Sequence, residues 1–322
     1  MMTNSTKEKL VVILGPTATG KTRLAIRIAQ KMKTSIVSGD SMLVYRGFDI
    51  GSAKPKEKER CGIHHALIDI IDSKDSGFNA SEFQKLAKAE IHVINAKGHI
   101  PILVGGTGLY VKALLEGYHF NQEREDIQFR STLTRLAKIH GNTYVHKMLE
   151  KVDPVTAARL HANDFRRVVR ALEVWHLGRQ RISQVKHEDG LVYDACVLGL
   201  RCDRQLLYNR IEKRIDMMIE EGLESEVRQL LLSGVPRNAR AMQGIGYKEM
   251  ASYIAGEQNY AETVETIKKA TRHFAKRQFT WYRKMPYIHW IEIDQRQFEE
   301  IVEESMKVIS VAFDIPANHS IS

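Results

Sequence analysis

Apolar and polar residues alternate in blocks along the first third of the chain, in an order typical of α/β proteins. Short apolar runs have the length and composition of buried strands and lie at Leu10–Leu14, Ser35–Val37 and Ile100–Val104. Helical patterns lie between them at Arg23–Lys31 and at Ser81–Asn95, where we expect Ser81 to cap the helix. This alternation predicts a parallel sheet wrapped by helices, with ligands at the carboxyl ends of the strands.

Helical patterns dominate the rest of the chain. After a change of composition near Tyr118 we expect helices at Asp126–His140, Thr143–Lys151, Pro154–Leu160 and Asp164–Leu177. Strand patterns return at Tyr193–Leu200 and Ile288–Ile293, with helices expected between them at Arg204–Glu221, Leu223–Ser233, Tyr247–Ala255 and Tyr260–Arg283. We therefore expect residues 1–117 and 191–322 to form an α/β core with a helical C-terminal part, and residues 118–190 to form an inserted all-helical subdomain.

A phosphate-binding motif stands directly behind the first predicted strand. Its glycines let successive backbone N–H groups turn inward around phosphate oxygens, its lysine supplies a cation, and its last hydroxyl suits Mg²⁺. The helix that follows points the positive end of its dipole at the anion. The motif predicts a P-loop fold, with phosphate-binding residues Gly15, Pro16, Thr17, Ala18, Thr19, Gly20, Lys21 and Thr22. Nucleoside triphosphates and other diphosphates offer the same oxygens, so the motif leaves the ligand open.

Two further polar segments follow predicted strands and should converge on the same edge of the sheet. Asp40, in Ser38-Gly39-Asp40-Ser41, could accept a proton, hold Mg²⁺ through water, or serve as a helix cap or turn residue. The segment Gly105–Tyr110 combines glycines with Thr107 and predicts a narrow backbone surface suited to close approach of a ligand.

Composition and charge limit the class of protein. The chain has 322 residues, 43% of them apolar, so we expect a sizeable core. Residues Met1–Lys9 lack the apolar stretch of a signal peptide, and no run is long enough to span a bilayer. We expect a cytoplasmic monomer with no membrane partner. The three cysteines, Cys61, Cys196 and Cys202, predict incidental thiols rather than a disulfide framework or zinc cluster.

The net charge of +9 is concentrated in one segment near the end of the chain. Between Thr266 and Tyr287 there are eight basic or histidine residues and no acidic one. On a helix, six of these residues would form two adjacent basic rows. Like charges at this spacing repel one another unless an anion lies nearby. Interleaved aromatic residues strengthen the hypothesis of a polyanion site, although a solvated helix face remains an alternative. The rows are Lys268, Arg272, Lys276 and Lys269, His273, Arg277.

Gly15–Thr22 and Asp40–Pro55 together resemble motifs of the tRNA dimethylallyltransferase family, the isopentenyl-tRNA transferases. P-loops are common, but the Asp40–Pro55 continuation is specific. The resemblance extends over nearly the whole chain through Gly105–Tyr110, Asn163–Glu173, Arg210–Asp216, Gly244–Tyr247 and Lys276–Trp281. We expect the chain to lack the zinc-finger extension of eukaryotic relatives, so it resembles the bacterial form.

The resemblance implies transfer of a dimethylallyl group from dimethylallyl diphosphate to N6 of the tRNA adenine on the 3′ side of the anticodon. The P-loop would then hold the prenyl diphosphate, with Mg²⁺ as cofactor and Thr22 as the metal-binding residue. Asp40 would be the general base, and the other catalytic residues would be Lys21, Thr22, Thr107 and Arg214. A surface ion pair of Arg214 with Glu212 or Asp216 remains an alternative.

The resemblance also implies contacts with a tRNA anticodon stem–loop, whose adenine must turn out of the loop to reach a cleft. Leu43 stands where many relatives have glutamine, so a polar base contact is not expected there. Without the resemblance, the arginines of Asn163–Glu173 equally fit a solvated helix face. The expected tRNA-binding residues are Asp40, Ser41, Met42, Leu43, Thr107, Arg130, Arg166, Arg167, Arg170, Gln243, Gly244, Ile245, Gly246, Tyr247 and Lys248.

Two other functions use the same motifs. A small-molecule or nucleotide kinase would bind ATP in the P-loop and use Asp40 as base or metal ligand. The large basic helical remainder argues against a small acceptor. A non-catalytic RNA-binding protein would use the basic surface and carry a vestigial P-loop. Replacing Lys21 would then have no effect on any RNA modification.

Overall fold

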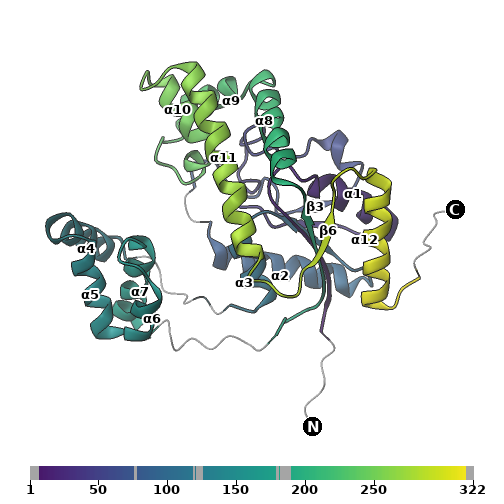
Figure 1. Ribbon diagram of the computed structural model, residues 1–322, viewed down its shortest axis with the longest axis horizontal. Helices are drawn as coiled ribbons and strands as arrows, with labels where there is room; N and C mark the ends of the chain where they lie inside the picture. The colour runs from purple at the N-terminus through teal and green to yellow at the C-terminus, as the bar shows by residue number, and fades with distance from the viewer. Residues whose placement is uncertain are drawn as a thin grey trace, which may run out of the picture. The chain divides into compact units, whose positions relative to one another are not determined.

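A parallel six-stranded sheet forms the centre of the larger of two units in the computed structural model (Figure 1). The structure describes residues 7–75, 78–118, 120, 126–178, 181 and 190–316. In the segment Met1–Lys9, where no signal peptide is expected, residues 1–6 lie outside these ranges. The strands are β1 (Lys9–Leu14), β2 (Ile36–Ser38), β3 (His65–Ala66), β4 (Ile102–Gly105), β5 (Asp194–Arg201) and β6 (His289–Glu292). Their spatial order is β3-β2-β4-β1-β5-β6, which places β1 near the middle.

Alternation along β1 divides the apolar core between the two faces of the sheet. Val11 and Ile13 face one layer, which contains α1 (Lys21–Met32) and α12 (Phe298–Phe313). Leu10, Val12 and Leu14 face the other layer. This second layer and its extension contain α2 (Ala80–Ala96), α3 (Gly108–Leu115), α8 (Arg204–Glu220), α9 (Leu223–Leu232), α10 (Tyr247–Ile254) and α11 (Tyr260–Tyr282). Helices therefore cover both faces, and the site must lie at the ends of the strands.

The larger unit comprises residues 1–116 and 190–322, and residues 117–189 form the second unit. The second unit has a core of its own, made by residues such as Leu133, Leu149 and Leu172. Asp126 and Asp153 cap two of its helices through their carboxylates. The helices are α4 (Ile127–His140), α5 (Asn142–Val152), α6 (Pro154–Arg159) and α7 (Phe165–Gly178).

The predicted α/β class, with a parallel sheet wrapped by helices, is confirmed, and several details differ. The cap of α2 is Asn79, whose side chain accepts hydrogen bonds from the backbone N–H groups of Ser81 and Glu82. The expectation of Ser81 as cap is therefore wrong. Among the described residues, the elements that were not expected are β3, α3, α12 and two short 3₁₀ helices at Glu57–Arg60 and Ala241–Gln243. No helix in the described part of the chain is long and apolar enough to cross a membrane.

Candidate active site

The P-loop turns sharply between β1 and the first residue of α1. Gly15 has a φ of 153°, and a Cβ there would lie 2.8 Å from the Leu200 carbonyl oxygen. Gly20 has a φ of 84° and leads directly into the helix at Lys21. The Thr19 hydroxyl donates to the Pro16 carbonyl at 2.8 Å, which closes the turn from within. The loop therefore has the conformation that the glycines of the motif predict.

Lys21 lies in a cavity of about 600 Å³, the P-loop cavity, which Gly20, Thr22 and Arg214 also line. Its ammonium donates to the Pro16 carbonyl oxygen at 2.7 Å. Burial, together with repulsion by the nearby Arg214 charge, lowers the pKa of Lys21 to about 7, while Asp40 acts in the opposite direction. A buried cation with a repelling neighbour is a place where an anionic ligand would be strongly favoured.

A second cavity of about 440 Å³, the Asp40 cavity, is lined by Asp40, Ser41, Thr107 and many apolar side chains. The Ser41 backbone N–H donates to the Thr107 hydroxyl oxygen at 3.1 Å, which joins the loop after β2 to the loop after β4. The Asp40 carboxylate accepts the Met42 N–H at 2.8 Å. The two strand ends converge as the sequence predicts, and Asp40 faces a cavity with mostly apolar walls.

Arg214 lines both cavities, and it projects from α8. The ion pairs that the sequence offered it are taken by other residues. Glu212 binds Arg272 of α11 at 2.5 Å, and Asp216 binds Lys268 at 2.7 Å. The surface ion-pair interpretation of Arg214 is therefore wrong, and its guanidinium lies where an anion in the P-loop cavity and a group in the Asp40 cavity would meet.

The glycines at the end of β4 are required by close contacts within the protein. A Cβ at Gly105 would lie 2.3 Å from the Gly39 carbonyl oxygen, and one at Gly106 would lie 2.6 Å from Nε2 of Gln278. The sequence predicted close approach of a ligand to this segment. The structure places protein backbone and a buried side chain there instead. Thr107, the next residue, does line the Asp40 cavity.

The segment expected to bind RNA around Gly244 divides between the cavity and the protein interior. Gln243, Gly244, Ile245 and Gly246 line the Asp40 cavity. Tyr247 is fully buried, and its hydroxyl donates to Glu226 at 2.7 Å, so its side chain serves the fold rather than a ligand surface. Burial and the Glu226 carboxylate raise the pKa of Tyr247 well above its usual range, which keeps this donor protonated. Lys248 is exposed and outside the lining. Leu43 is half-buried and also outside it.

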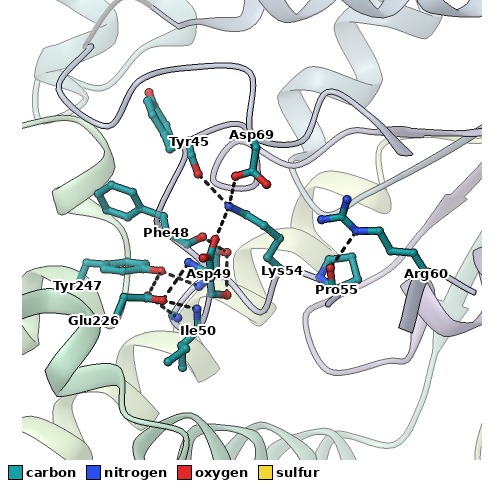
Figure 2. A network of polar contacts seen from close by, with 12 residues as sticks. Tyr45, Phe48, Asp49, Ile50, Lys54, Pro55, Arg60, Asp69, Glu226 and Tyr247 are labelled. Carbon is teal, nitrogen blue, oxygen red and sulfur yellow. Dashed lines mark hydrogen bonds and ion pairs between the residues drawn. The ribbon is translucent and has the colours of Figure 1, made fainter. Parts of the chain in front are cut away.

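Glu226 of α9 anchors the loop that begins at Asp49 (Figure 2). Its carboxylate accepts backbone N–H groups of Asp49 at 3.1 Å, Ile50 at 2.7 Å and Gly51 at 3.2 Å. Gly51 and the next residue line the Asp40 cavity, and residues 53 and 55 line the P-loop cavity. A Cβ at Gly51 would lie 2.6 Å from the Tyr247 ring, so this position also requires glycine.

Buried Lys54 holds the other side of the same loop (Figure 2). Its ammonium donates to the Tyr45 carbonyl at 2.9 Å and to Asp49 at 2.5 Å, and it also contacts Asp69. Only 5% of its side chain is exposed. These contacts assign a structural reason to the specific run Asp40–Pro55: its residues line both cavities, and hydrogen bonds to Glu226 fasten it to α9.

One of the two basic rows predicted on α11 is partly neutralised within the protein. Lys268 and Arg272 form ion pairs with carboxylates of α8, so their charges are neutralised within the protein. Lys269, His273 and Arg277 of the other row are not paired in this way, and Arg277 reaches the rim of the Asp40 cavity. The predicted polyanion site is therefore limited to Lys276 and the second row.

In the second unit, Glu173 organises two of the expected RNA-binding arginines. Its carboxylate is fully buried and binds Arg130 at 2.7 and 2.8 Å and Arg170 at 2.5 Å. These hydrogen bonds lower the pKa of Glu173 against the opposing effect of burial, which on its own would raise it. Arg166 and Arg167 are exposed on the same helix.

The residues around the P-loop fit a metal ion only in partnership with a ligand. Among the described residues no group of three or more His, Cys, Asp or Glu side chains is placed to hold one. Thr22, Glu59 and Glu299 line the P-loop cavity. Mg²⁺ commonly keeps waters and takes its remaining ligands from one or two protein oxygens and from substrate phosphates, which this donor set allows. The three cysteines are free thiols, with Cys61 exposed, Cys196 buried and Cys202 half-buried.

Comparison with known proteins agrees with this geometry. Residues 43–285 match the family model described as IPP transferase. The chain is 45% identical over 294 residues to the tRNA dimethylallyltransferase of Bacillus cytotoxicus, covering 91% of this chain and 92% of the relative. The crystal structure of a tRNA isopentenylpyrophosphate transferase from Bacillus halodurans is 40% identical with a TM-score of 0.73, covering 96% of this chain and 97% of that one.

A eukaryotic dimethylallyltransferase acting on tRNA, also solved by crystallography, has a TM-score of 0.83 at 27% identity. That similarity covers 97% of this chain and 81% of the eukaryotic one. The resemblance carried by the P-loop and the Asp40–Pro55 run is thereby confirmed over almost the full length, in sequence and in structure. The chain belongs to the IPP transferase family.

Proposed function

We propose that the chain transfers a dimethylallyl group from dimethylallyl diphosphate to N6 of the adenine that lies 3′ to the anticodon in tRNA. The observation that carries this proposal is the meeting of two cavities at Arg214, one with P-loop cations and one with a carboxylate and apolar walls. A prenyl diphosphate has the matching division into an anionic end and an apolar end.

The diphosphate belongs in the P-loop cavity. Breaking the allylic C1–O bond leaves the electron pair on the diphosphate, so its negative charge increases in the transition state. Lys21, Arg214 and the N-terminus of α1 stabilise that charge more strongly than the charge of the bound substrate. Thr22 would hold Mg²⁺ together with diphosphate oxygens, and the ion would supply further charge to the leaving group.

The acceptor adenine belongs in the Asp40 cavity. As N6 forms its bond to C1, it must lose a proton, and the Asp40 carboxylate is the base that accepts it. Thr107 and Ser41 hold each other beside Asp40 and orient the base edge. Because adenine N6 is a weak nucleophile, this orientation matters as much as basicity.

The tRNA stem–loop is held outside the cavities by exposed basic side chains. Arg166 and Arg167 in the second unit, and Arg277 with its basic neighbours on α11, supply charges for phosphate contacts. Arg130 and Arg170 contribute from the positions that Glu173 gives them.

The test is prenyl transfer from labelled dimethylallyl diphosphate to an unmodified anticodon stem–loop RNA, with Mg²⁺ and without ATP. Label on adenine N6 is the expected result. Asp40→Asn keeps the shape of the side chain and removes the base, so it should abolish turnover while RNA affinity stays near that of the wild type. Absence of transfer, together with phosphate release when ATP is supplied, would refute the proposal and favour the kinase alternative.

A further inference from the structure

One buried carboxamide links the two loops that carry the reaction. Gln278 lies on α11 and is only 4% exposed. Its Oε1 accepts the backbone N–H of Thr17 in the P-loop at 2.9 Å, and its Nε2 donates to the Gly106 carbonyl oxygen at 2.8 Å. The P-loop and the turn after β4 are therefore bonded to the same side chain, although 261 and 172 residues of sequence separate them from it.

The contact is tight on the side of the acceptor cavity. A Cβ at Gly106 would lie 2.6 Å from Nε2 of Gln278 and 3.9 Å from an Asp40 carboxylate oxygen. Gln278 and Asp40 therefore lie against the same residue. Gly106 is followed by Thr107, whose hydroxyl accepts the Ser41 N–H. A shift of Gln278 would move the Gly106 turn and, through it, the loop that carries Asp40.

A second side chain of α11 supports the same carbonyl. The fully buried Tyr282 hydroxyl donates to the Gly106 oxygen at 2.9 Å and lies 3.3 Å from the Gly15 oxygen at the start of the P-loop. Burial raises the pKa of Tyr282 well above its usual range, so the phenol stays protonated and remains a donor. Gln278 and Tyr282 lie one turn apart on α11, and each hydrogen-bonds to both the P-loop and Gly106.

We propose that Gln278 is a positioning residue for the transfer reaction, setting the distance between the P-loop, which holds the diphosphate, and the loop that holds Asp40. Gln278 lines neither cavity, so it acts through Thr17 and Gly106 rather than on the substrates. The inference rests on the proposed prenyl transfer. Transfer needs N6 and C1 in near contact while the diphosphate stays in the P-loop, and a misplacement of about 1 Å costs about a hundredfold in rate.

The experiment compares Gln278→Met with a matched control, Gln84→Met. Gln84 is also a buried glutamine, 9% exposed, and its Nε2 donates to a backbone carbonyl, that of Ala113, at 2.7 Å. It lines neither cavity. Both changes keep side-chain length and remove the carboxamide. Thermal melting, RNA affinity, and kcat and KM for prenyl transfer are measured for each.

We expect similar losses of melting temperature in both variants, with kcat about a hundredfold lower in Gln278→Met and within about twofold of wild type in Gln84→Met. The RNA dissociation constant should not change. A Gln278→Met variant with the kcat of the control would overturn the inference, as would a loss confined to RNA affinity. Wild-type protein without transfer activity would instead refute the proposed function.

Gly106→Ala provides a second route to the same perturbation, because its Cβ would displace Nε2 of Gln278. It should lower kcat in the same way, and the double variant with Gln278→Met should be little worse than either single one. If Gln278→Met does not fold, Gly106→Ala alone decides, and a wild-type kcat in that variant would overturn the inference.

Discussion

The lowered pKa of Lys21 predicts that binding of the diphosphate takes up a proton. In the free protein the pKa of Lys21 is about 7, first because the ammonium is buried and then because Arg214 repels it. A bound diphosphate favours the charged ammonium and raises that pKa again. At pH 8 about nine-tenths of the Lys21 side chains are neutral before binding, so binding should take up about 0.9 proton; at pH 6 the uptake should fall to about 0.1.

Isothermal titration calorimetry with inorganic diphosphate, in two buffers of different ionisation enthalpy, measures this uptake directly. Lys21→Met is the control, because it removes the ammonium and leaves any proton exchange by the ligand itself. Above pH 7 the affinity of the wild type should fall by up to about tenfold per pH unit, about 1.4 kcal/mol, relative to the variant. Equal proton uptake by the two proteins at pH 8 would show that Lys21 is not the group that takes up the proton.

The same pKa has a consequence for folding. The folded state lowers the pKa of Lys21 from 10.5, so between about pH 7 and 10.5 the unfolded chain binds more protons. The contribution of Lys21 to the free energy of unfolding is therefore least favourable below pH 7, and it should improve as the pH rises through that window. Urea unfolding of the wild type and of Lys21→Met at pH 7 and 9 would show the difference.

Other contacts predict effects on stability that denaturant unfolding can measure. Glu226→Ala leaves three backbone N–H groups and the Tyr247 hydroxyl without their acceptor, which should cost roughly 3 kcal/mol, while Glu226→Gln should cost about 1 kcal/mol; equal losses would contradict this account. Gly51→Ala should lower the free energy of unfolding by about 1–3 kcal/mol through overpacking against the Tyr247 ring. An unchanged free energy of unfolding would mean that the ring moves aside. Glu173→Ala removes the carboxylate that Arg130 and Arg170 share, and it should lower the free energy of unfolding of the second unit by about 3–5 kcal/mol. An unchanged denaturation midpoint would contradict this.

Strand-end logic explains why part of the site could be predicted from the sequence. Parallel strands end at the same edge of a sheet, so the order of strands and loops along the chain is enough to place the P-loop, Asp40 and Thr107 together. Arg214 was expected only through the family resemblance, because a helix pattern does not say which of several charged residues faces a cavity. In the sequence, Glu212 and Asp216 are alternative ion-pair partners for Arg214.

The structural roles of Gln278 and Glu226 could not be predicted from the sequence, for a different reason. Both act by hydrogen bonds to backbone groups, which every residue offers, and across long separations in the chain. Helix α3 was missed because six of its eight residues are buried, so its apolar positions show no helical period. Helix α12, in contrast, has a regular amphipathic pattern, so the sequence does carry a signal for it.

The binding of Glu226 to the Asp49–Gly51 backbone has a consequence for selectivity. Successive N–H groups that point to one spot form an anion-binding nest, the same device that the P-loop uses for phosphate. At Asp49–Gly51 the chain supplies its own anion from α9, so these donors are occupied before any ligand arrives. A diphosphate would find the Asp49–Gly51 donors already bound to Glu226 and the P-loop with Lys21 beside it. It would therefore be directed to the P-loop, where Lys21 supplies a cation, rather than to Asp49–Gly51.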